Sequence, residues 1–191
     1  MSEKALTDTI YLEMKMIRSS GYERCYIVPG NYGMDFLTEQ LELDAELTVK
    51  CSNYVGEAIE DARLLGMKGI GHVGKWIKLA AGVMNTHSRQ ADCRMEVLAV
   101  HAAMQGADRE SVCRIMQCLN TTEALKIIRQ LGILEPVMAS VMDRIDFYLS
   151  GRAGGEFEIG AIMFSNEDGI LGKTPNAEQL LERIQNERKQ K

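Results

Sequence analysis

Three times within the first 85 residues, an apolar strand is expected to run into a short loop that contains glycine and then into a helix. Strands that alternate with crossover helices build a parallel sheet whose faces the helices cover. The pattern therefore predicts an α/β fold, a Rossmann-like three-layer domain with a mostly parallel sheet and helices on both faces. The strands and their loops are 25–28 with Pro29-Gly30-Asn31-Tyr32-Gly33, 46–51 with Ser52-Asn53-Tyr54-Val55-Gly56, and the very short 67–70 with Gly71-His72-Val73-Gly74-Lys75.

The rest of the chain is mostly helical by its apolar periodicity. One more strand is expected at 157–164, and a turn at 166–169 leads from it into residues 170–171. We expect one domain over 1–174 and a charged, solvated terminal helix or tail over 175–191. The expected helices are 2–20, 34–41, 55–65, 74–83, 89–105, 108–118, 121–131 and 134–150.

Composition limits the class of protein. At 191 residues and a net charge of −5, the chain is long enough for one core and lacks the basic stripe of a nucleic-acid surface. No apolar run approaches the roughly 20 residues of a membrane span, and the N-terminus shows no signal-peptide pattern. Five scattered cysteines favour reduced thiols over a disulfide framework. We therefore expect a cytoplasmic protein with no nucleic-acid or membrane partner.

The three glycine loops predict a ligand-binding edge. The carboxyl ends of parallel strands share one edge of the sheet, and ligands of open α/β sheets bind there. Asn31, Ser52 and Asn53 would offer hydrogen-bond partners at that edge. Glycine and asparagine also serve tight turns without any ligand, and this alternative stays open.

Residues 68–94 concentrate groups that bind anions. The stretch holds two of the three histidines and five cationic side chains, and its polar residues cluster at two expected helix starts. Free backbone N–H groups and the positive end of the helix dipole meet at a helix start, so anions bind there. In an acidic chain this favours an acidic small-molecule ligand, while a solvated lysine face or a plain helix cap would use some of the same residues. The candidate anion-binding residues are His72, Lys75, Lys78, Thr86, His87, Ser88 and Arg89.

Two familiar glycine patterns overlap at the third loop, and neither fits fully. Gly69-x-Gly71-x-x-Gly74 has the spacing of the dinucleotide fingerprint, but it follows the third expected strand rather than the first. The phosphate-loop spacing ends in Gly74-Lys75-Trp76, and tryptophan cannot bind magnesium as serine or threonine does. Both patterns are therefore poor guides to the ligand.

A metal site is also disfavoured by spacing. The available ligands in the same region are His72, His87 and Cys93, and no two of them have the spacing of one helix face or of a CxxC pair. Cys113 and Cys118 lie five residues apart, which fits neither a redox pair nor a zinc knuckle. We expect no protein-bound metal.

Four blocks of the sequence carry a family resemblance: Asn31-Tyr32-Gly33, Cys51-Ser52-Asn53-Tyr54-Val55-Gly56, Gly71-His72-Val73-Gly74-Lys75 with Lys78-Leu79-Ala80-Ala81-Gly82, and Asn85-Thr86-His87-Ser88-Arg89 with Ala91-Asp92. In this order and spacing they resemble the CbiD family, the cobalt-precorrin-5B methyltransferases of anaerobic cobalamin biosynthesis. The similarity extends over about residues 1–174. It implies methyl transfer from S-adenosylmethionine to ring carbon 1 of a cobalt-bearing polycarboxylate corrin precursor, and a Rossmann-like fold for this half of the family.

The resemblance also implies roles for the predicted edge. A sulfonium methyl is already activated, so transfer needs alignment more than a strong acid or base, and no catalytic residue is identified. The cationic stretch would hold substrate carboxylates and the glycine loops would hold the donor, although the sequence leaves open which loop holds which ligand. The candidate donor-binding residues are Gly30, Asn31, Tyr32, Gly33, Ser52, Asn53, Gly56, Gly71 and Gly74.

The chain departs from the family pattern in two ways. Family members carry an N-terminal domain of comparable size, so this chain resembles the C-terminal half alone and that domain is a possible partner. The strand ahead of Gly71 also looks shorter than in the family. Both departures leave room for two other interpretations, a non-catalytic module that binds a corrinoid or a nucleotide, and a nucleotide-dependent oxidoreductase.

Overall fold

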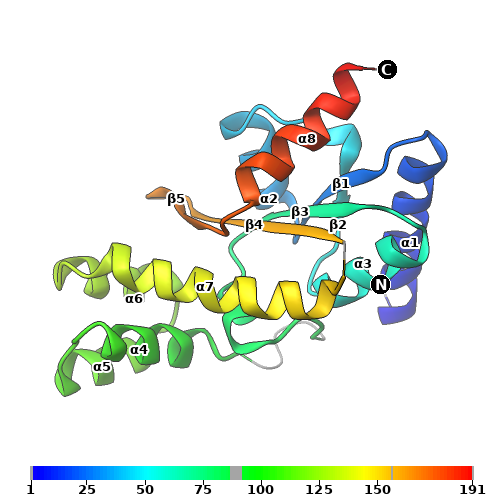
Figure 1. Cartoon of the computed structure of the whole chain (residues 1–191). Helices are drawn as coiled ribbons and strands as arrows, with labels where there is room; N and C mark the ends of the chain where they lie inside the picture. The colour runs from blue at the N-terminus through cyan, green and yellow to red at the C-terminus, as the bar shows by residue number, and fades with distance from the viewer. Residues whose placement is uncertain (1, 87–91, 156, 191) are drawn as a thin grey trace.

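A five-stranded sheet lies at the centre of the molecule (Figure 1). The structure is a computed structural model that describes residues 2–86, 92–155 and 157–190. The strand order is β2-β1-β3-β4-β5, so the chain builds outwards on both sides of β1. The strands are β1 (Arg24–Val28), β2 (Thr48–Lys50), β3 (Gly69–Gly74), β4 (Glu158–Ser165) and β5 (Gly169–Lys173).

The sheet is mixed, which corrects the expectation of a mostly parallel sheet. Strands β2, β1, β3 and β4 pair in parallel, and β5 pairs with β4 in antiparallel orientation. Only residues 166–168 separate β4 from β5, and so short a connection forms a hairpin because a parallel crossover needs a dozen residues or more. Gly169 adopts a φ of +70°, a conformation that suits glycine at the end of this turn. The expected α/β class is confirmed.

Helices pack on both faces of the sheet. In Figure 1 the helix α8 lies on one side of the strands, whereas α7 lies on the other side with α6 beside it and α4 and α5 farther from the sheet. The helices α1 and α3 pack against each other, and α3 also contacts β3 and α7. The α-helices are α1 (Glu3–Ser19), α2 (Asn31–Asp35), α3 (Val55–Leu64), α4 (Arg94–Met104), α5 (Arg109–Met116), α6 (Thr121–Gln130), α7 (Leu134–Ala153) and α8 (Ala177–Lys189).

Three shorter helical segments complete the described chain. The single-turn π-helix η1 (Phe36–Gln40) continues α2, and the 3₁₀-helix η2 (Ala45–Leu47) precedes β2. The 3₁₀-helix η3 (Ile77–Ala81) replaces the longer helix expected at 74–83. The reason is that β3 extends to Gly74 and that Gly82 ends the segment with a φ of 75°. The expected helix at 89–105 is observed from Arg94, since residues 87–91 lie outside the described part.

Glycines in the central strands allow α8 to approach the sheet closely. Tyr26, Gly71 and Gly160 form one row across β1, β3 and β4. A Cβ atom on Gly160 would lie 2.8 Å from the Cα of Ala177 in α8, and one on Gly71 would lie 2.9 Å from Cδ1 of Leu181. The glycines of β3 therefore mark close packing in a buried strand, not a loop. This explains why the third strand is longer than the sequence predicted.

The terminal helix α8 is part of the core. Its inner residues are buried, and the hydroxyl of Tyr26 donates a hydrogen bond of 3.0 Å to the backbone oxygen of Leu181. The expected helix is therefore present, but only its outer, charged face is solvated. The buried residues of α8 are Ala177, Leu180, Leu181 and Ile184.

Candidate functional site

The carboxyl ends of β1 and β3 form a topological switch point. From β1 the chain continues to β2 on one side, and it returns through α3 to β3 on the other side. Ligands of open α/β sheets bind in the crevice at such a point, because the two following loops diverge there. The residues that follow the two strands are Pro29 and Gly30 after β1, and Lys75 and Trp76 after β3. Three hollows open at this edge, and Lys75 lines two of them.

The first hollow, which we call the cationic hollow, has a volume of about 430 Å³. Arg94 donates through Nε and Nη2 to the two carboxylate oxygens of Asp92 at 2.7 and 2.8 Å. This hydrogen-bonded pair lowers the pKa of Asp92 to about 2, so the carboxylate neutralises Arg94 at any physiological pH. Lys75 and Lys78 add two more positive charges, which favour an anionic ligand. The lining consists of Pro29, Asn53, Lys75, Trp76, Lys78, Asp92 and Arg94.

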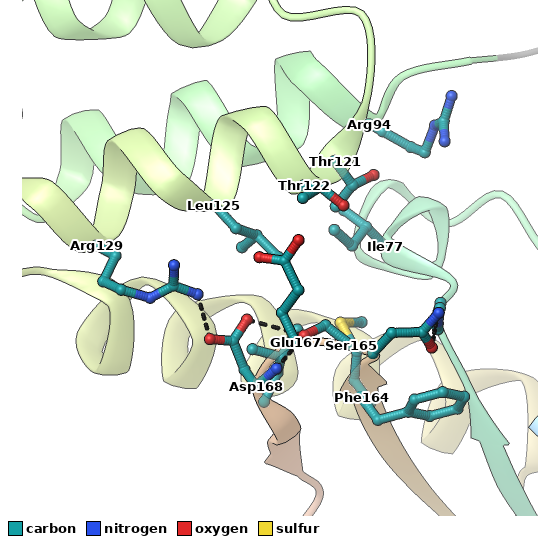
Figure 2. Close-up of a pocket in the computed structure, with 14 residues that line it drawn as sticks. Ile77, Arg94, Thr121, Thr122, Leu125, Arg129, Phe164, Ser165, Glu167 and Asp168 are labelled. Carbon is teal, nitrogen blue, oxygen red and sulfur yellow. Dashed lines mark hydrogen bonds and ion pairs between the residues drawn. The ribbon is translucent and has the colours of Figure 1, made fainter. Parts of the chain in front are cut away.

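The second hollow lies between α6 and the end of β4 and has a volume of about 280 Å³ (Figure 2). Arg129 points at Asp168 and pairs with it, and Asp168 also accepts a hydrogen bond of 2.8 Å from the hydroxyl of Ser165. In Figure 2, Arg94 lies at the other end of the hollow from Arg129. We call it the α6 hollow. Because Lys75 and Arg94 line this hollow as well, it adjoins the cationic hollow.

The third hollow lies beside α2 and η1 and has a volume of about 330 Å³. Three aromatic side chains line it, together with two carboxylates, and we call it the aromatic hollow. Phe164 is shared with the α6 hollow, so the side chain at the end of β4 separates the two. The lining consists of Tyr32, Asp35, Phe36, Glu39, Gln40, Phe164, Ser165, Asn166 and Gly169.

Lys75 lines the cationic hollow and the α6 hollow, and it contacts side chains that line the aromatic hollow. Its ammonium group donates a hydrogen bond to the side-chain oxygen of Asn166 and lies 5.1 Å from the ring centres of both Tyr32 and Phe164. Partial burial lowers the pKa of Lys75, because the charged ammonium loses part of its water. The sequence singled out this residue, and the structure places it at the carboxyl edge of β3 as expected.

The first predicted loop has two different kinds of residue. Gly30 is open, since a Cβ atom there would have no other atom within 4 Å, and the side-chain oxygen of Asn31 accepts a hydrogen bond of 2.9 Å from Lys50. Gly33 is buried, and a Cβ there would lie 2.9 Å from Cβ of Val28. Gly33 therefore has a packing role, whereas Gly30 and Asn31 are accessible to a ligand.

Two backbone hydrogen bonds connect the second predicted loop to the segment that follows η3. The backbone N–H of Thr86 donates to the oxygen of Asn53 at 3.0 Å, and the N–H of Gly56 donates to the oxygen of Met84 at 3.1 Å. Ser52 adopts a φ of +49°, which is rare outside glycine and turns the chain sharply after β2. Of this loop, Asn53 lines the cationic hollow.

The bounds predicted for the third loop are wrong. Residues 71–74 belong to β3, so the loop begins only at Lys75. His72 pairs with Ile27 and Ala161 in neighbouring strands and is 2 % exposed. Burial lowers the pKa of His72 to about 4, and its Nε2 has no hydrogen-bond partner in the described part of the chain. His72 therefore lies beneath the edge and lines none of the three hollows.

Gly71 and Gly74 are also inside the sheet. A Cβ on Gly74 would lie 2.7 Å from two atoms of the Pro29 ring, so this glycine lets the first loop close over the end of β3. Thr86 is buried, and Lys78 is 9 % exposed. His87, Ser88 and Arg89 lie outside the described residues, and their role in binding remains a prediction.

Comparison with known proteins places the chain. Residues 85–175 match the family model of the CbiD C-terminal domain. Within these residues the chain belongs to the CbiD family. The sequence is 39 % identical to a cobalt-precorrin-5B C(1)-methyltransferase of Ruminiclostridium cellulolyticum, over 96 % of this chain and 50 % of the relative. Proteins of the same name are 35 % identical in Clostridioides difficile, over 95 % of this chain and 46 % of the relative, and 37 % identical in Citrobacter koseri, over 97 % and 50 %.

The CbiD-family chain spans about half the length of the curated relatives it matches. No solved structure matches it. Within the described residues, no three His, Cys, Asp or Glu side chains come together where they could hold a metal ion. Among the helices of that same part, none is long and apolar enough to cross a membrane.

Several residues of this CbiD-family edge escaped the sequence analysis. Trp76, Phe164 and Asn166 line the hollows although no motif marked them. A usable signal was the expected strand at 157–164, because its carboxyl end must reach the same edge if it pairs in parallel. The aromatic residue at the end of that strand was therefore predictable as part of the site.

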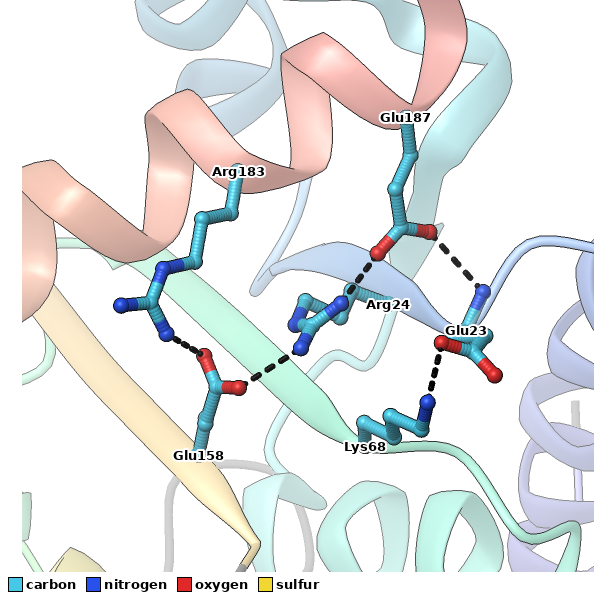
Figure 3. A network of polar contacts seen from close by, with 6 residues as sticks. All are labelled: Glu23, Arg24, Lys68, Glu158, Arg183 and Glu187. Carbon is cyan, nitrogen blue, oxygen red and sulfur yellow. Dashed lines mark hydrogen bonds and ion pairs between the residues drawn. The ribbon is translucent and has the colours of Figure 1, made fainter. Parts of the chain in front are cut away.

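A second polar cluster lies at the opposite edge of the sheet and is structural (Figure 3). Arg24 donates to Glu158 at 2.6 Å and to Glu187 of α8, and Arg183 of α8 donates to Glu158 at 2.9 Å. Glu187 also accepts a hydrogen bond of 3.0 Å from the backbone of Glu23. Arg24 and Glu158 begin β1 and β4, so this network ties α8 to the amino ends of the strands.

Proposed function

We propose that this chain is the substrate-holding half of an S-adenosylmethionine-dependent methyltransferase that acts on ring carbon 1 of cobalt-precorrin-5B in cobalamin biosynthesis. The names of the relatives support the reaction. The observation that carries the proposal is the cationic hollow, where Lys75 and Lys78 lie at the switch point beside the neutralised pair of Asp92 and Arg94. A corrin precursor is fringed with carboxylates, and ammonium and guanidinium groups are their natural partners.

The proposed methyl transfer requires this edge to position the two reactants, and it does not require acid or base catalysis. In the transfer, the bond from the methyl carbon to sulfur breaks with its electron pair left on sulfur, while a substrate carbon supplies the pair for the new carbon–carbon bond. Holding the two reactants in line can supply on the order of 7–11 kcal/mol of the barrier reduction. Lysines at the edge would orient the substrate through its carboxylates, and Asn31 and Asn53 would offer hydrogen bonds to the donor.

The fold is proposed to act as a Rossmann-like domain, with the donor at the switch point beside Gly30, Asn31 and Asn53. The hollows of about 280 to 430 Å³ are small for a macrocycle, since even drug-sized ligands occupy pockets of roughly 300–1,000 Å³. A second surface must therefore cover the substrate, and we propose that the other half of the full-length protein provides it.

A binding experiment tests the proposal. Arg89→Ala and Lys78→Ala should each raise the Kd for a corrin polycarboxylate by roughly 10- to 150-fold, as expected for a lost hydrogen bond to a charged group. Arg109→Ala, on the exposed start of α5, is the matched control and should leave the Kd unchanged. Unchanged Kd values for both test variants would place the substrate elsewhere.

A turnover experiment tests the need for a second half. The chain alone should transfer methyl groups very slowly or not at all, and addition of the N-terminal half of a family member should restore transfer. Turnover by the isolated chain equal to that of a full-length relative would show that one edge suffices. Binding without turnover in either case would identify a non-catalytic corrinoid-binding module.

A further inference from the structure

One cation already lies beside the aromatic hollow, over two of the rings that line it. Phe36 and Phe164 stack with their ring centres 3.9 Å apart and an interplanar angle of 10°, and the Lys75 ammonium lies over the Phe164 ring and the Tyr32 ring, 5.1 Å from each centre. A cation within about 6 Å of a ring centre is attracted by the negative face of the ring. The rings of Tyr32 and Phe164 therefore bind a positive charge between them in the present geometry.

Two carboxylates reinforce the same preference. Asp35 and Glu39 both line the hollow and are accessible to solvent. Neither forms an ion pair with a cation in the described part of the chain, so both are available to a positive ligand. Lys75 itself has a neutral hydrogen-bond partner, Asn166, and can leave the rings without stranding a carboxylate.

The walls of the hollow differ in their exposure to solvent. Phe164 is 2 % exposed and belongs to β4, whereas Tyr32 is 71 % exposed. Phe36 and Glu39 come from η1, a π-helix, a conformation that is rare and occurs frequently at functional sites. A buried ring, an exposed ring and two carboxylates form a compact receptor for a small organic cation.

We propose that the aromatic hollow binds an onium group, a sulfonium or quaternary ammonium cation, in the place now held by the Lys75 ammonium. If the proposed methyl transfer holds, on which this identification rests, the ligand is the sulfonium of the methyl donor. Lys75 lines the cationic hollow too, so a substrate carboxylate there draws the ammonium away from the rings and opens them to the donor. After transfer the donor sulfur is a neutral thioether, which loses this attraction and leaves.

The probe that tests the site is trimethylsulfonium chloride, observed through its methyl proton signals in saturation-transfer titrations of the whole chain. Lys75→Gln removes the competing ammonium and should lower the Kd by roughly three- to thirty-fold. In the Lys75→Gln background, Tyr32→Leu should raise the Kd by a similar factor, and Tyr32→Phe should not. Asp35→Asn combined with Glu39→Gln should raise it as well.

Two controls separate this site from general cation binding. Tyr11 on α1 lies under Lys15 in a similar pair at 6.0 Å, so Tyr11→Leu in the same background should leave the Kd unchanged. The neutral probe tert-butanol should show no dependence on Tyr32. Thermal melting of each variant confirms that it is folded.

The outcomes are distinguishable from those of the corrin experiment. Absence of saturable trimethylsulfonium binding in Lys75→Gln, or binding that Tyr32→Leu does not weaken, overturns the inference. Corrin polycarboxylate binding at Lys78 would then still stand, because it depends on the cationic hollow alone. Sulfonium binding without corrin binding would support the onium site and contradict the proposed substrate.

Discussion

Asn85 caps a helix that begins 30 residues earlier in the chain, because its side-chain oxygen accepts a hydrogen bond of 3.0 Å from the backbone N–H of Glu57 in the first turn of α3. Asn85 also forms an antiparallel bridge with Tyr54. The bond lies immediately before Thr86 and the predicted anion-binding residues that follow it. The Asn85 side chain thus connects the second glycine loop to the chain segment that carries the predicted anion-binding residues from Thr86 onwards.

Asn85→Ala should lower the free energy of unfolding by about 0.5–2 kcal/mol, the usual cost of losing a helix cap. The physical reason is that the N–H of Glu57 loses its partner at a helix start. Urea unfolding followed by circular dichroism measures the change. Asn186→Ala, on the exposed face of α8, is the matched control and should change stability by no more than about 0.5 kcal/mol. Equal effects of the two substitutions would show that the cap contributes nothing.

Gly74→Ala and Gly30→Ala should have opposite effects on folding. A Cβ on Gly74 would clash with the Pro29 ring at 2.7 Å, and overpacking of this kind typically costs about 1–3 kcal/mol. Gly30 has an extended φ of 178° and open space around it, so alanine there should be neutral or slightly stabilising. Thermal melting compares the two variants. A drop in donor affinity for Gly30→Ala without a change in melting temperature would support a ligand role for Gly30.

His72 should make the protein less stable as the pH falls. Burial lowers the pKa of His72 to about 4, whereas in the unfolded chain it titrates near the ordinary 6.5. The unfolded state therefore takes up a proton first, so the stability that is fully present above pH 6.5 is lost progressively between pH 6.5 and about 4. The loss at most is on the order of 3 kcal/mol.

His72→Leu removes this titration and fills the same buried position. The difference in unfolding free energy between the variant and the parent should grow in favour of the variant from pH 7 to pH 4.5, measured by urea unfolding at each pH. Carboxylates such as Asp92 titrate alike in both proteins and cancel. A difference that stays constant with pH would mean that His72 takes up its proton equally in the folded and unfolded states.

Arg24→Ala should destabilise the fold by about 1–3 kcal/mol, between the values for exposed and for fully buried ion pairs. The substitution leaves Glu158 and Glu187 without their shared partner, and their side chains are only 26 % and 21 % exposed. Burial raises the pKa of Glu158, but the hydrogen bonds and charges of Arg24 and Arg183 outweigh it and hold the pKa below its ordinary value.

The matched control is Lys4→Ala, which breaks the exposed pair of Lys4 and Asp8 within α1. This pair is highly accessible to water, so its loss should change the unfolding free energy by no more than about 0.5 kcal/mol. Urea unfolding measures both variants. Similar values for Arg24→Ala and Lys4→Ala would show that the network does not anchor α8.

The sequence predicted the class of fold because strand–loop–helix periodicity survives without tertiary information. The prediction was wrong at β3, because glycine occurs both in loops and in closely packed strands. Gly30 lies in a loop, whereas Gly71 lies in a strand against which a helix packs closely. Only the position of α8 distinguishes the two cases. The turn between β4 and β5 was predicted from the sequence. The antiparallel direction of β5 follows from the short length of that turn, and the apolar periodicity carries no information about that direction.

The candidate site was predicted in the same uneven way. Lys75 and Asn53 were found because they follow strands directly, and the rule that strand ends share an edge needs no further information. Asp35, Phe36 and Glu39 line the aromatic hollow but were missed, because no periodicity in the sequence marks the π-helix that follows α2. His72 was misplaced by the same error that shortened β3.

The ion network of Arg24 and the hollows around Lys75 lie at opposite ends of the same strands, separated by roughly 15–20 Å along β3. At such a distance their free-energy effects should add independently. Substitutions at the two edges can therefore be combined without affecting each other. Substitutions at the amino edge are expected to change stability, and substitutions at the carboxyl edge are expected to change the proposed ligand binding. The end of α8 lies at the amino edge, where Arg188 donates a hydrogen bond of 3.0 Å to the Tyr22 hydroxyl, so a label or fusion joined after α8 would start away from the hollows around Lys75.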